Sequence, residues 1–353
     1  MRAMRAPSIP LLALVLVCTT TAGCSDDGGG DGGSGPSDPS FLDPIEHDFP
    51  AVPLQPGEEI TSLCLSWSIG NEAPLFVNGV TMHAGPGWHH SNWFYVPEGT
   101  FPVDDGVWPC SDAGFNQLAA AQAGGVLFAQ STQATDETQT FPQGAALEIP
   151  PASVVVSQIH LLNSGDGAID TGVSMTLAPM AEAEVEIRLH PLAFDFHQLA
   201  IPPQQRSRFE AECDMEASLG GPLDAISLYY VLPHYHARAE GMDIQIFGGE
   251  RDGERIYRVE SGIGEPLGAT LSPPFSLAGA RGIRFSCTYD NRSEATIGYG
   301  NSGQAEMCIF LAFTDSALSW AGGVVNGQPS MRGVEDGVAV FTGPCGTVAL
   351  PTP

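Results

Sequence analysis

The chain has 353 residues, of which 43% are hydrophobic, so it is long enough to bury a substantial core. Its formal net charge is −28, and all 13 basic residues are arginine. A surface this acidic repels phosphate backbones, which excludes nucleic acid as an expected partner.

The first 24 residues are predicted to be an export signal. Arg2 and Arg5 supply positive charge, and residues 9–17 form an apolar run that is too short to span a bilayer. Residues 21–24 (TAGC) match the lipobox of bacterial lipoproteins, in which the cysteine, here Cys24, is acylated and becomes the mature N-terminus. The alternative is an ordinary secretory signal that is cleaved nearby. With the lipobox, we expect an exported protein that is lipid-anchored in the bacterial cell envelope, at the outer membrane.

Residues 25–45 are predicted to form a disordered tether. Residues 25–40 are almost entirely Gly, Ser, Asp and Pro, and they offer no apolar side chain to bury. Such a tether would hold a folded body away from the membrane. No later segment approaches the length of a transmembrane helix, so we expect membrane contact through Cys24 alone.

The cysteine content agrees with export. Two of the 8 cysteines, Cys18 and Cys24, lie in the signal. The remaining six are Cys64, Cys110, Cys213, Cys287, Cys308 and Cys345. An even set in an oxidising compartment predicts disulfides, and the absence of any C-x-x-C pair argues against a zinc ribbon or a redox motif. Six cysteines allow fifteen pairings, and their spacing does not select one.

Short β-branched or aromatic stretches, bounded by Gly, Pro, Asn and Asp, dominate the rest of the chain. They are typical of an all-β sandwich or barrel. The predicted strands lie at residues 62–68, 126–129, 154–162, 173–177, 225–232, 242–247, 282–288 and 307–314. Only residues 114–124 (GFNQLAAAQAG) predict a short helix.

A polar, proline-containing stretch at residues 178–186 interrupts this strand pattern. It predicts two consecutive β domains of similar size, at residues 46–182 and 183–353. No internal repeat relates the two.

The strongest candidate metal ligands are His234 and His236, which follow the apolar run 226–232. On a strand, residues i and i+2 point to the same face, so both imidazoles can approach one ion. Alone, H-x-H also fits two surface histidines at a strand end. Met307 adds a thioether that, beside two imidazoles, suits copper cycling between Cu(I) and Cu(II). The alternative role for Met307 is to fill a gap in the core.

Three more histidines are candidates. His89 and His90 are neighbours, so they reach one ion jointly only at a bulge or a strand end. His160 ends an apolar strand, where a lone histidine is more often structural. Three imidazoles suit copper or zinc equally well. His83, His190 and His197 remain open as further ligands.

The order of these motifs resembles that of the copper type II, ascorbate-dependent monooxygenases, the family that includes dopamine beta-monooxygenase and the peptidylglycine alpha-hydroxylating enzyme. The similarity covers about residues 60–314, and SCTYDNRSEATIGYG from Ser286, followed by EMC, is its most specific part. The matching pieces, in order, are Cys64 in SLCLSW, His89-His90, His160 in VVVSQIHLLNSGD, GVSMTL at 172–177, Cys213, His234 and His236, Ser286 to Gly300, and Glu306-Met307-Cys308.

This resemblance implies two antiparallel, jelly-roll-like β-sandwich domains with one copper ion on each. His89, His90 and His160 would hold the electron-transferring copper. The oxygen-binding copper would have His234, His236 and Met307 as ligands. The resemblance also implies disulfides between Cys64 and Cys110, Cys213 and Cys345, and Cys287 and Cys308.

The chain departs from the family pattern at several positions. Ser91 stands where a methionine usually follows the second paired histidine. The peptide-amidating member has an arginine two residues before its H-x-H pair, and this chain has Leu232. That member's asparagine and tyrosine after the EMC triplet correspond to Ile309 and Leu311. Since those three groups bind a peptide's C-terminal end, peptide amidation is not expected here.

Two functional hypotheses follow. The first is a copper-dependent monooxygenase that hydroxylates a C–H bond of a small substrate with O2 and ascorbate or a similar reductant. No side-chain nucleophile or paired-carboxylate motif suggests another chemistry. The second is a non-catalytic surface lipoprotein of the same fold that binds copper or another partner. Retention of all six ligand types favours the enzyme.

Overall fold

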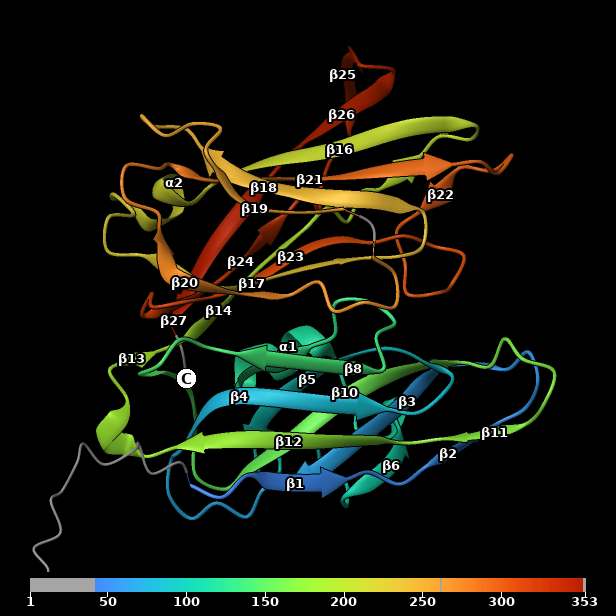
Figure 1. The fold of residues 1–353 in the computed structure, drawn as a ribbon, viewed down its shortest axis with the longest axis vertical. Coiled ribbons are helices and arrows are strands. Elements are labelled where there is room, and N and C mark those ends of the chain that lie inside the picture. Colours follow the sequence, from blue (N-terminus) through green and yellow to red (C-terminus); the bar gives the residue numbers. More distant parts are fainter. Residues whose placement is uncertain (1–41, 261, 352–353) are drawn as a thin grey trace, which may run out of the picture. The chain divides into compact units, whose positions relative to one another are not determined.

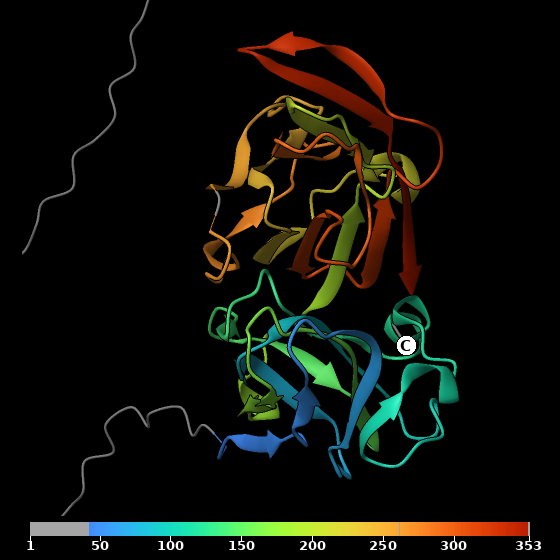
Figure 2. The ribbon, with the colours of Figure 1, turned by 90° about the vertical axis from the view of Figure 1, so that its right-hand side faces the viewer.

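The computed structural model describes residues 42–260 and 262–351. Cys24, the predicted signal and most of the predicted tether lie outside these residues. The described residues belong to one compact unit and are mostly strands, as predicted (Figure 1). The strands assemble into two successive β-sandwiches, which form the blue-to-green and yellow-to-red groups of strands in Figure 2.

The first sandwich has two main sheets and a small ribbon. One sheet has the order β1 (Ile45–Asp48), β12 (Val173–Met180), β4 (Leu75–Ala84), β9 (Ala145–Ile149) and β13 (Ile187–Arg188), and β8 (Asp136–Thr140) also pairs with β4. The other has the order β6 (Gly106–Pro109), β3 (Glu59–Ser68), β10 (Ser153–Leu162), β5 (Trp88–Pro97) and β7 (Gly125–Ala129). The ribbon pairs β2 (Val52–Leu54) with β11 (Ile169–Thr171). Strand β10 is antiparallel to both of its neighbours and is buried on both faces, with Val155 and Ile159 in one apolar cluster and Val156 in another. Burial of both faces explains its long apolar run.

The second sandwich repeats this plan with different connections. One sheet has the order β20 (Ala269–Ser276), β17 (Ser227–Tyr235), β23 (Cys308–Thr314), β14 (His190–Asp195), β24 (Leu318–Gly323) and β27 (Gly346–Pro351). The other has the order β19 (Arg255–Glu260), β18 (Ala239–Phe247), β21 (Gly282–Asn291), β16 (Gln205–Asp214), β26 (Val338–Pro344) and β25 (Ser330–Glu335). A short ribbon joins β15 (Ala200–Ile201) to β22 (Ile297–Gly298).

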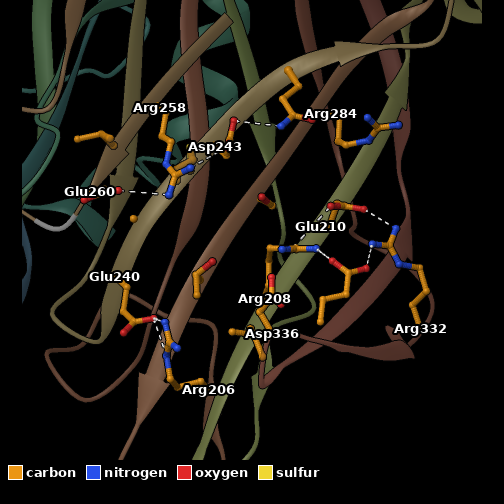
Figure 3. A pocket seen from close by; sticks show the side chains of 18 residues that line it. Arg206, Arg208, Glu210, Glu240, Asp243, Arg258, Glu260, Arg284, Arg332 and Asp336 are labelled. Atoms are coloured by element: carbon orange, nitrogen blue, oxygen red, sulfur yellow. Dashed lines mark hydrogen bonds and ion pairs between the residues drawn. The ribbon is translucent and has the colours of Figure 1, made fainter. Parts of the chain in front are cut away.

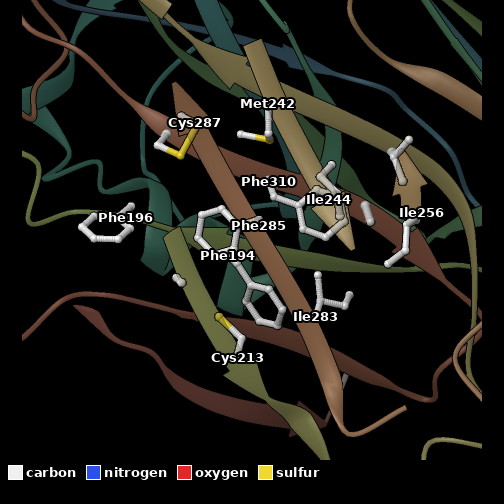
Figure 4. Close-up of a cluster of buried hydrophobic side chains, with 14 of the residues drawn as sticks. Phe194, Phe196, Cys213, Met242, Ile244, Ile256, Ile283, Phe285, Cys287 and Phe310 are labelled. Carbon is white, nitrogen blue, oxygen red and sulfur yellow. A yellow bond between two sulfur atoms is a disulfide. The ribbon is translucent and has the colours of Figure 1, made fainter. Parts of the chain in front are cut away.

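The core of the second sandwich lies between its two sheets (Figure 4). Phe194 and Phe310 come from one sheet, and Phe285 and Ile244 come from the other. All four side chains are fully buried. At about 2 kcal/mol for each large apolar side chain removed from water, such residues supply most of the force that holds the sheets together.

Helices are few in the described part of the chain. Helix α1 (Gln117–Ala123) lies inside the stretch predicted to be helical, and the Asn116 side chain caps it by accepting from Ala119 N. Helix α2 (Met215–Leu219) has Asp214 as its N-cap. Two short 3₁₀ turns span Cys110–Asp112 and Glu182–Glu184.

The chain passes between the sandwiches later than at the predicted residues 178–186, at Leu189 between β13 and β14. After the turn at Glu182–Glu184, β13 still pairs with β9 of the first sandwich, and the first strand of the second sandwich is β14. At the other end, the predicted tether is one residue too long. Ile45 already lies in β1, opposite Leu177, because the antiparallel edge of β12 accepts it.

An apolar contact links the two sandwiches. Phe141 of the first lies 5.1 Å from Phe313 and 6.0 Å from Tyr230 of the second, measured between ring centres. Hydrogen bonds flank this contact, including Thr132 Oγ1 to Glu265 O at 2.8 Å and Thr270 Oγ1 to Thr140 O at 2.6 Å. The buried side chains on both sides of this contact therefore form one continuous cluster.

Three disulfides join Cys64 to Cys110, Cys213 to Cys345, and Cys287 to Cys308. These are the three pairings that the family resemblance implied. Disulfides of this kind belong to an oxidising, extracytoplasmic environment. Within residues 42–260 and 262–351, no helix is long and apolar enough to cross a membrane.

The outer face of the sheet around β16, β18 and β21 carries a hollow of about 890 Å³ (Figure 3). Its five arginines each have a carboxylate partner: Arg206 with Glu240, Arg208 with Glu335, Arg258 with Glu260, Arg284 with Glu212, and Arg332 with Glu210. The charges that line the hollow therefore neutralise one another. We interpret these ion pairs as the solvent-facing surface of the sheet rather than as a ligand-binding site.

Candidate metal centre

The adjacent histidines His89 and His90 lie at the start of β5, where the ladder with β10 is irregular. His160 pairs with His90 and Leu161 pairs with Trp88, so His89 is an extra residue in the ladder. This is the bulge that two neighbouring histidines require to reach one site. Gly87 makes the preceding turn with a φ of +84°, and a Cβ there would lie 2.7 Å from Ile169 Cδ1. Only glycine fits.

His234 lies at the end of β17, a mostly buried strand that pairs with β23, and His236 directly follows the last residue of β17. The residue between them, Tyr235, points the other way and is fully buried in the core of the second sandwich. Strand alternation therefore places both imidazoles on one side, as the sequence predicts.

The five histidines form one cluster with contributions from both sandwiches. The rings of His89 and His160 lie 4.3 Å apart, and the His90 ring lies 5.3 Å from those of His234 and His236. Two groups have ligand atoms within 4.8 Å of one another: His89, His90 and His160, and His90, His234 and His236. The sequence suggested one separate set on each domain, whereas the structure brings the two sets together at His90.

His160 has one nitrogen occupied and one free. Its Nε2 lies 2.9 Å from Glu59 Oε1, while its Nδ1 is buried without a hydrogen-bond partner. The same Glu59 oxygen accepts from Gly303 N at 3.2 Å, so it also contacts the loop that precedes Met307. A carboxylate on the outer nitrogen of a histidine fixes the ring for metal binding through the other nitrogen.

The second pair repeats this arrangement with backbone carbonyls. His234 Nδ1 lies 3.1 Å from Gln130 O, and His236 Nδ1 lies 3.0 Å from Ala305 O. When Nδ1 of a neutral imidazole donates, the lone pair is on Nε2. His236 Nε2 is buried and unpartnered. A bound ion would satisfy this otherwise costly buried acceptor.

His89 and His90 approach each other through their Nδ1 atoms, at 3.2 Å. Two ligand nitrogens about 2.0 Å from one tetrahedral ion are about 3.3 Å apart, so this spacing suits shared coordination. The Gln133 side-chain amide lies 2.9 Å from His89 Nε2 and supports the ring from behind.

The histidines are held in the neutral form that binds metal. Burial, reinforced by the neighbouring imidazoles, lowers the pKa of His89 to about 3. Burial, followed by the effect of His236, lowers the pKa of His234 to about 3. Burial also lowers the pKa of His90, His160 and His236. At neutral pH, no proton has to be displaced before a metal ion binds.

Met307 lies beside the second pair. It directly precedes β23, whose first residue, Cys308, pairs with Tyr235 of β17. Continuing this antiparallel register by one residue places Met307 opposite His236. Tyr289 donates its hydroxyl to Met307 O at 2.6 Å. Glu306, fully buried, accepts from His236 N at 3.0 Å and Arg238 N at 2.7 Å. Burial raises the pKa of Glu306 to about 7 despite these bonds.

Several supporting residues carry no recognisable sequence signal. Glu59, Gln130, Gln133 and Ala305 contact the histidines from segments far away along the chain. Ser91, which departs from the family pattern, is also buried beside the site. It accepts from the indole nitrogens of Trp88 at 3.3 Å and Trp93 at 2.9 Å. Only the strand pairings reveal these contacts.

The other candidate histidines lie outside the two histidine groups. His83 is exposed and bonds Asp136 Oδ1 at 2.6 Å. His197 faces Asp195 at 3.5 Å and packs on Tyr299. His190 begins β14, opposite Thr314. None of the three joins a metal-binding group in the described part of the chain.

Behind the segment that bonds His234, Glu137 is 2% exposed. Its Oε2 accepts from Ser131 N at 2.9 Å, and its Oε1 has no partner. Burial raises the pKa of Glu137 to about 7 from 4.5, so the folded state favours the protonated carboxyl. Between pH 4.5 and pH 7 the carboxyl ionises in the unfolded chain but stays protonated in the folded one. The free energy of unfolding therefore falls as the pH rises through this range.

We expect Glu137→Gln to remove this pH dependence. Relative to wild type, the free energy of unfolding of the variant should rise by roughly 2–3 kcal/mol between pH 5 and pH 8. Denaturant unfolding of both metal-free proteins at the two pH values measures this difference. Other titrating groups contribute equally to both proteins, so an unchanged difference would contradict the assignment.

No model of a known protein family matches the sequence, and no curated protein matches it. Among solved structures, the chain is similar to the major capsid protein P2 from Bacteriophage PM2, with 8% identity over 77% of this chain and 97% of that chain, and a TM-score of 0.31. It is also similar to the D431N mutant VP2 protein of Infectious Bursal Disease Virus, with 11% identity over 80% and 71% of the two chains and a TM-score of 0.14. TM-scores this low support no conclusion about function.

Proposed function

We propose that this chain is a copper-dependent monooxygenase that hydroxylates a C–H bond of a small substrate with O2 and an ascorbate-like reductant. One observation carries the proposal. The five histidines that the family resemblance implies as ligands converge. In His160, His234 and His236, one ring nitrogen is held by an oxygen acceptor. Such outer partners are typical of histidines that bind metal rather than of histidines that fill a core.

Copper would supply the redox chemistry and the activation of O2. The residues of the chain would supply geometry. Glu59 orients His160 with Nδ1 inward, and the carbonyls of Gln130 and Ala305 orient His234 and His236 with Nε2 inward. Burial keeps the imidazoles neutral and limits access of water to the site.

The resemblance places His89, His90 and His160 around the electron-transferring copper, and His234, His236 and Met307 around the oxygen-binding copper. The two sets contribute different nitrogens. His89, His90 and His160 offer Nδ1, while His234 and His236 offer Nε2. The thioether of Met307 would favour the reduced ion that must meet oxygen.

We also propose that the mature protein is a lipoprotein anchored through Cys24 in the cell envelope. The lipobox at residues 21–24 supports this assignment. The disulfides agree with export but do not distinguish an anchored protein from a secreted one.

The function is tested by loading the purified chain with copper. We expect two copper ions per chain by elemental analysis, together with ascorbate-dependent oxygen uptake above that of free copper. Uptake should be assayed with amines, phenols and peptides as substrates. Two bound coppers without oxygen uptake would favour the non-catalytic copper-binding lipoprotein. A preference for zinc or a single bound copper would contradict the two-copper assignment.

A further inference from the structure

His90 belongs to a second histidine group that spans the two sandwiches. It lies on β5 of the first sandwich, while His234 lies on β17 of the second and His236 directly follows that strand. Their ring centres are nearly equidistant, at 5.3 Å for His90–His234, 5.3 Å for His90–His236 and 5.5 Å for His234–His236.

This triangle has the dimensions of a three-imidazole metal site. For a tetrahedral ion about 2.0 Å from each ring nitrogen, the ring centres are expected to lie about 5 Å apart. In the group within the first sandwich, His89 and His160 are closer, with ring centres at 4.3 Å. The group that spans both sandwiches is therefore the more regular of the two.

The nitrogens of the second sandwich are already oriented for this site. The carbonyls of Gln130 and Ala305 hold the Nδ1 atoms of His234 and His236, and His236 Nε2 is buried without a partner. Gln130 belongs to the first sandwich, so that sandwich supplies one ligand and orients another. The site is complete only when both sandwiches contribute.

We propose that His90, His234 and His236 form a site for a single divalent late first-row ion of the zinc class, which fastens the two sandwiches together. Three neutral imidazoles with no carboxylate ligand suit Zn²⁺ and leave a fourth position open. An ion held here takes ligands from both of the proposed copper sets. The zinc site and the two-copper state are therefore alternative metal states of the same side chains, and one chain cannot hold both at once.

The test uses Co²⁺ as a spectroscopic probe and Zn²⁺ as its competitor on the metal-free chain. We expect the first equivalent of Co²⁺ to give the visible absorption of a tetrahedral ion, and one equivalent of Zn²⁺ to displace it. His90→Ala, His234→Ala and His236→Ala should each weaken zinc binding by about a hundredfold or more, since loss of even an outer-shell partner costs ten- to a hundredfold. The matched variants His89→Ala and His160→Ala should leave the affinity for the first ion unchanged.

Two results would overturn the proposal. If His160→Ala lowers the affinity for the first ion as much as His90→Ala does, the ion lies within the first sandwich. If His90→Ala has no effect, the ion lies within the second. Thermal unfolding of each metal-free variant checks its fold, and His90→Gln replaces any His90→Ala protein that does not fold. The test is made without copper and without oxygen uptake. A failed zinc site therefore leaves the proposed copper function open, and copper-loaded protein without oxygen uptake leaves this zinc site open.

Discussion

Replacing Met307 with leucine is expected to lower ascorbate-dependent oxygen uptake of the copper-loaded protein by about a hundredfold, the scale of losing a supporting metal contact. Leucine keeps the volume of this 6% exposed side chain, so the fold should change little. It removes only the sulfur, the one soft ligand beside His234 and His236. Copper should still bind through the two imidazoles, more weakly. Oxygen uptake and copper affinity are measured on the same preparation.

The matched control is Met242→Leu, which changes another buried methionine in the second sandwich. Its packing cost should be similar, below about 1.5 kcal/mol, and its oxygen uptake should equal that of wild type. Equal losses of uptake in the two variants would assign Met307 to core packing. Unchanged copper affinity in Met307→Leu would support the same conclusion.

Removal of the Cys213–Cys345 disulfide is expected to lower the free energy of unfolding by about 5 kcal/mol. The bond links residues 132 apart in sequence, and closing so long a loop restricts the unfolded chain most. Cys345 lies between β26 and β27, so the bond ties the point where the chain passes from one sheet to the other to the end of β16. The double variant Cys213→Ala/Cys345→Ala should therefore melt about 10 °C or more below wild type.

The same argument predicts a smaller contribution to stability from the Cys287–Cys308 disulfide. Cys287–Cys308 closes a separation of only 21 residues, so its removal should cost about 3 kcal/mol. Denaturant unfolding of the two double variants compares the losses directly. A larger loss for the Cys287 and Cys308 variant would contradict the chain-entropy account. Free thiols at positions 213 and 345 in peptide mass mapping would contradict the pairing itself.

Most strands follow from their sequence pattern because they are buried on at least one face. The predicted strand at 154–162 corresponds to β10, and that at 282–288 corresponds to β21, which extends to Asn291. Short edge strands such as β13 and β15 were not predicted. Two residues are too few for any periodicity, and partner strands far along the chain determine where they form.

The candidate site was only partly predictable. The spacing of His234 and His236 fixes their common face, and the structure places both as expected. By contrast, the proximity of His90 to them depends on how the two sandwiches pack at Phe141, Tyr230 and Phe313, which no local pattern encodes. Glu59 was missed for a similar reason, because it lies 101 residues from the histidine that it orients.

The bulge at His89 also affects how this site can be lost in evolution. Because His89 is an extra residue in the ladder, Trp88 and His90 already pair with Leu161 and His160. A related chain that is one residue shorter at this point would keep the alternation of every other side chain on β5 and would lose one ligand. In an alignment with relatives of this protein, a deletion of one residue at His89 would therefore indicate a chain that keeps the sandwich but lacks one ligand of the group His89, His90 and His160.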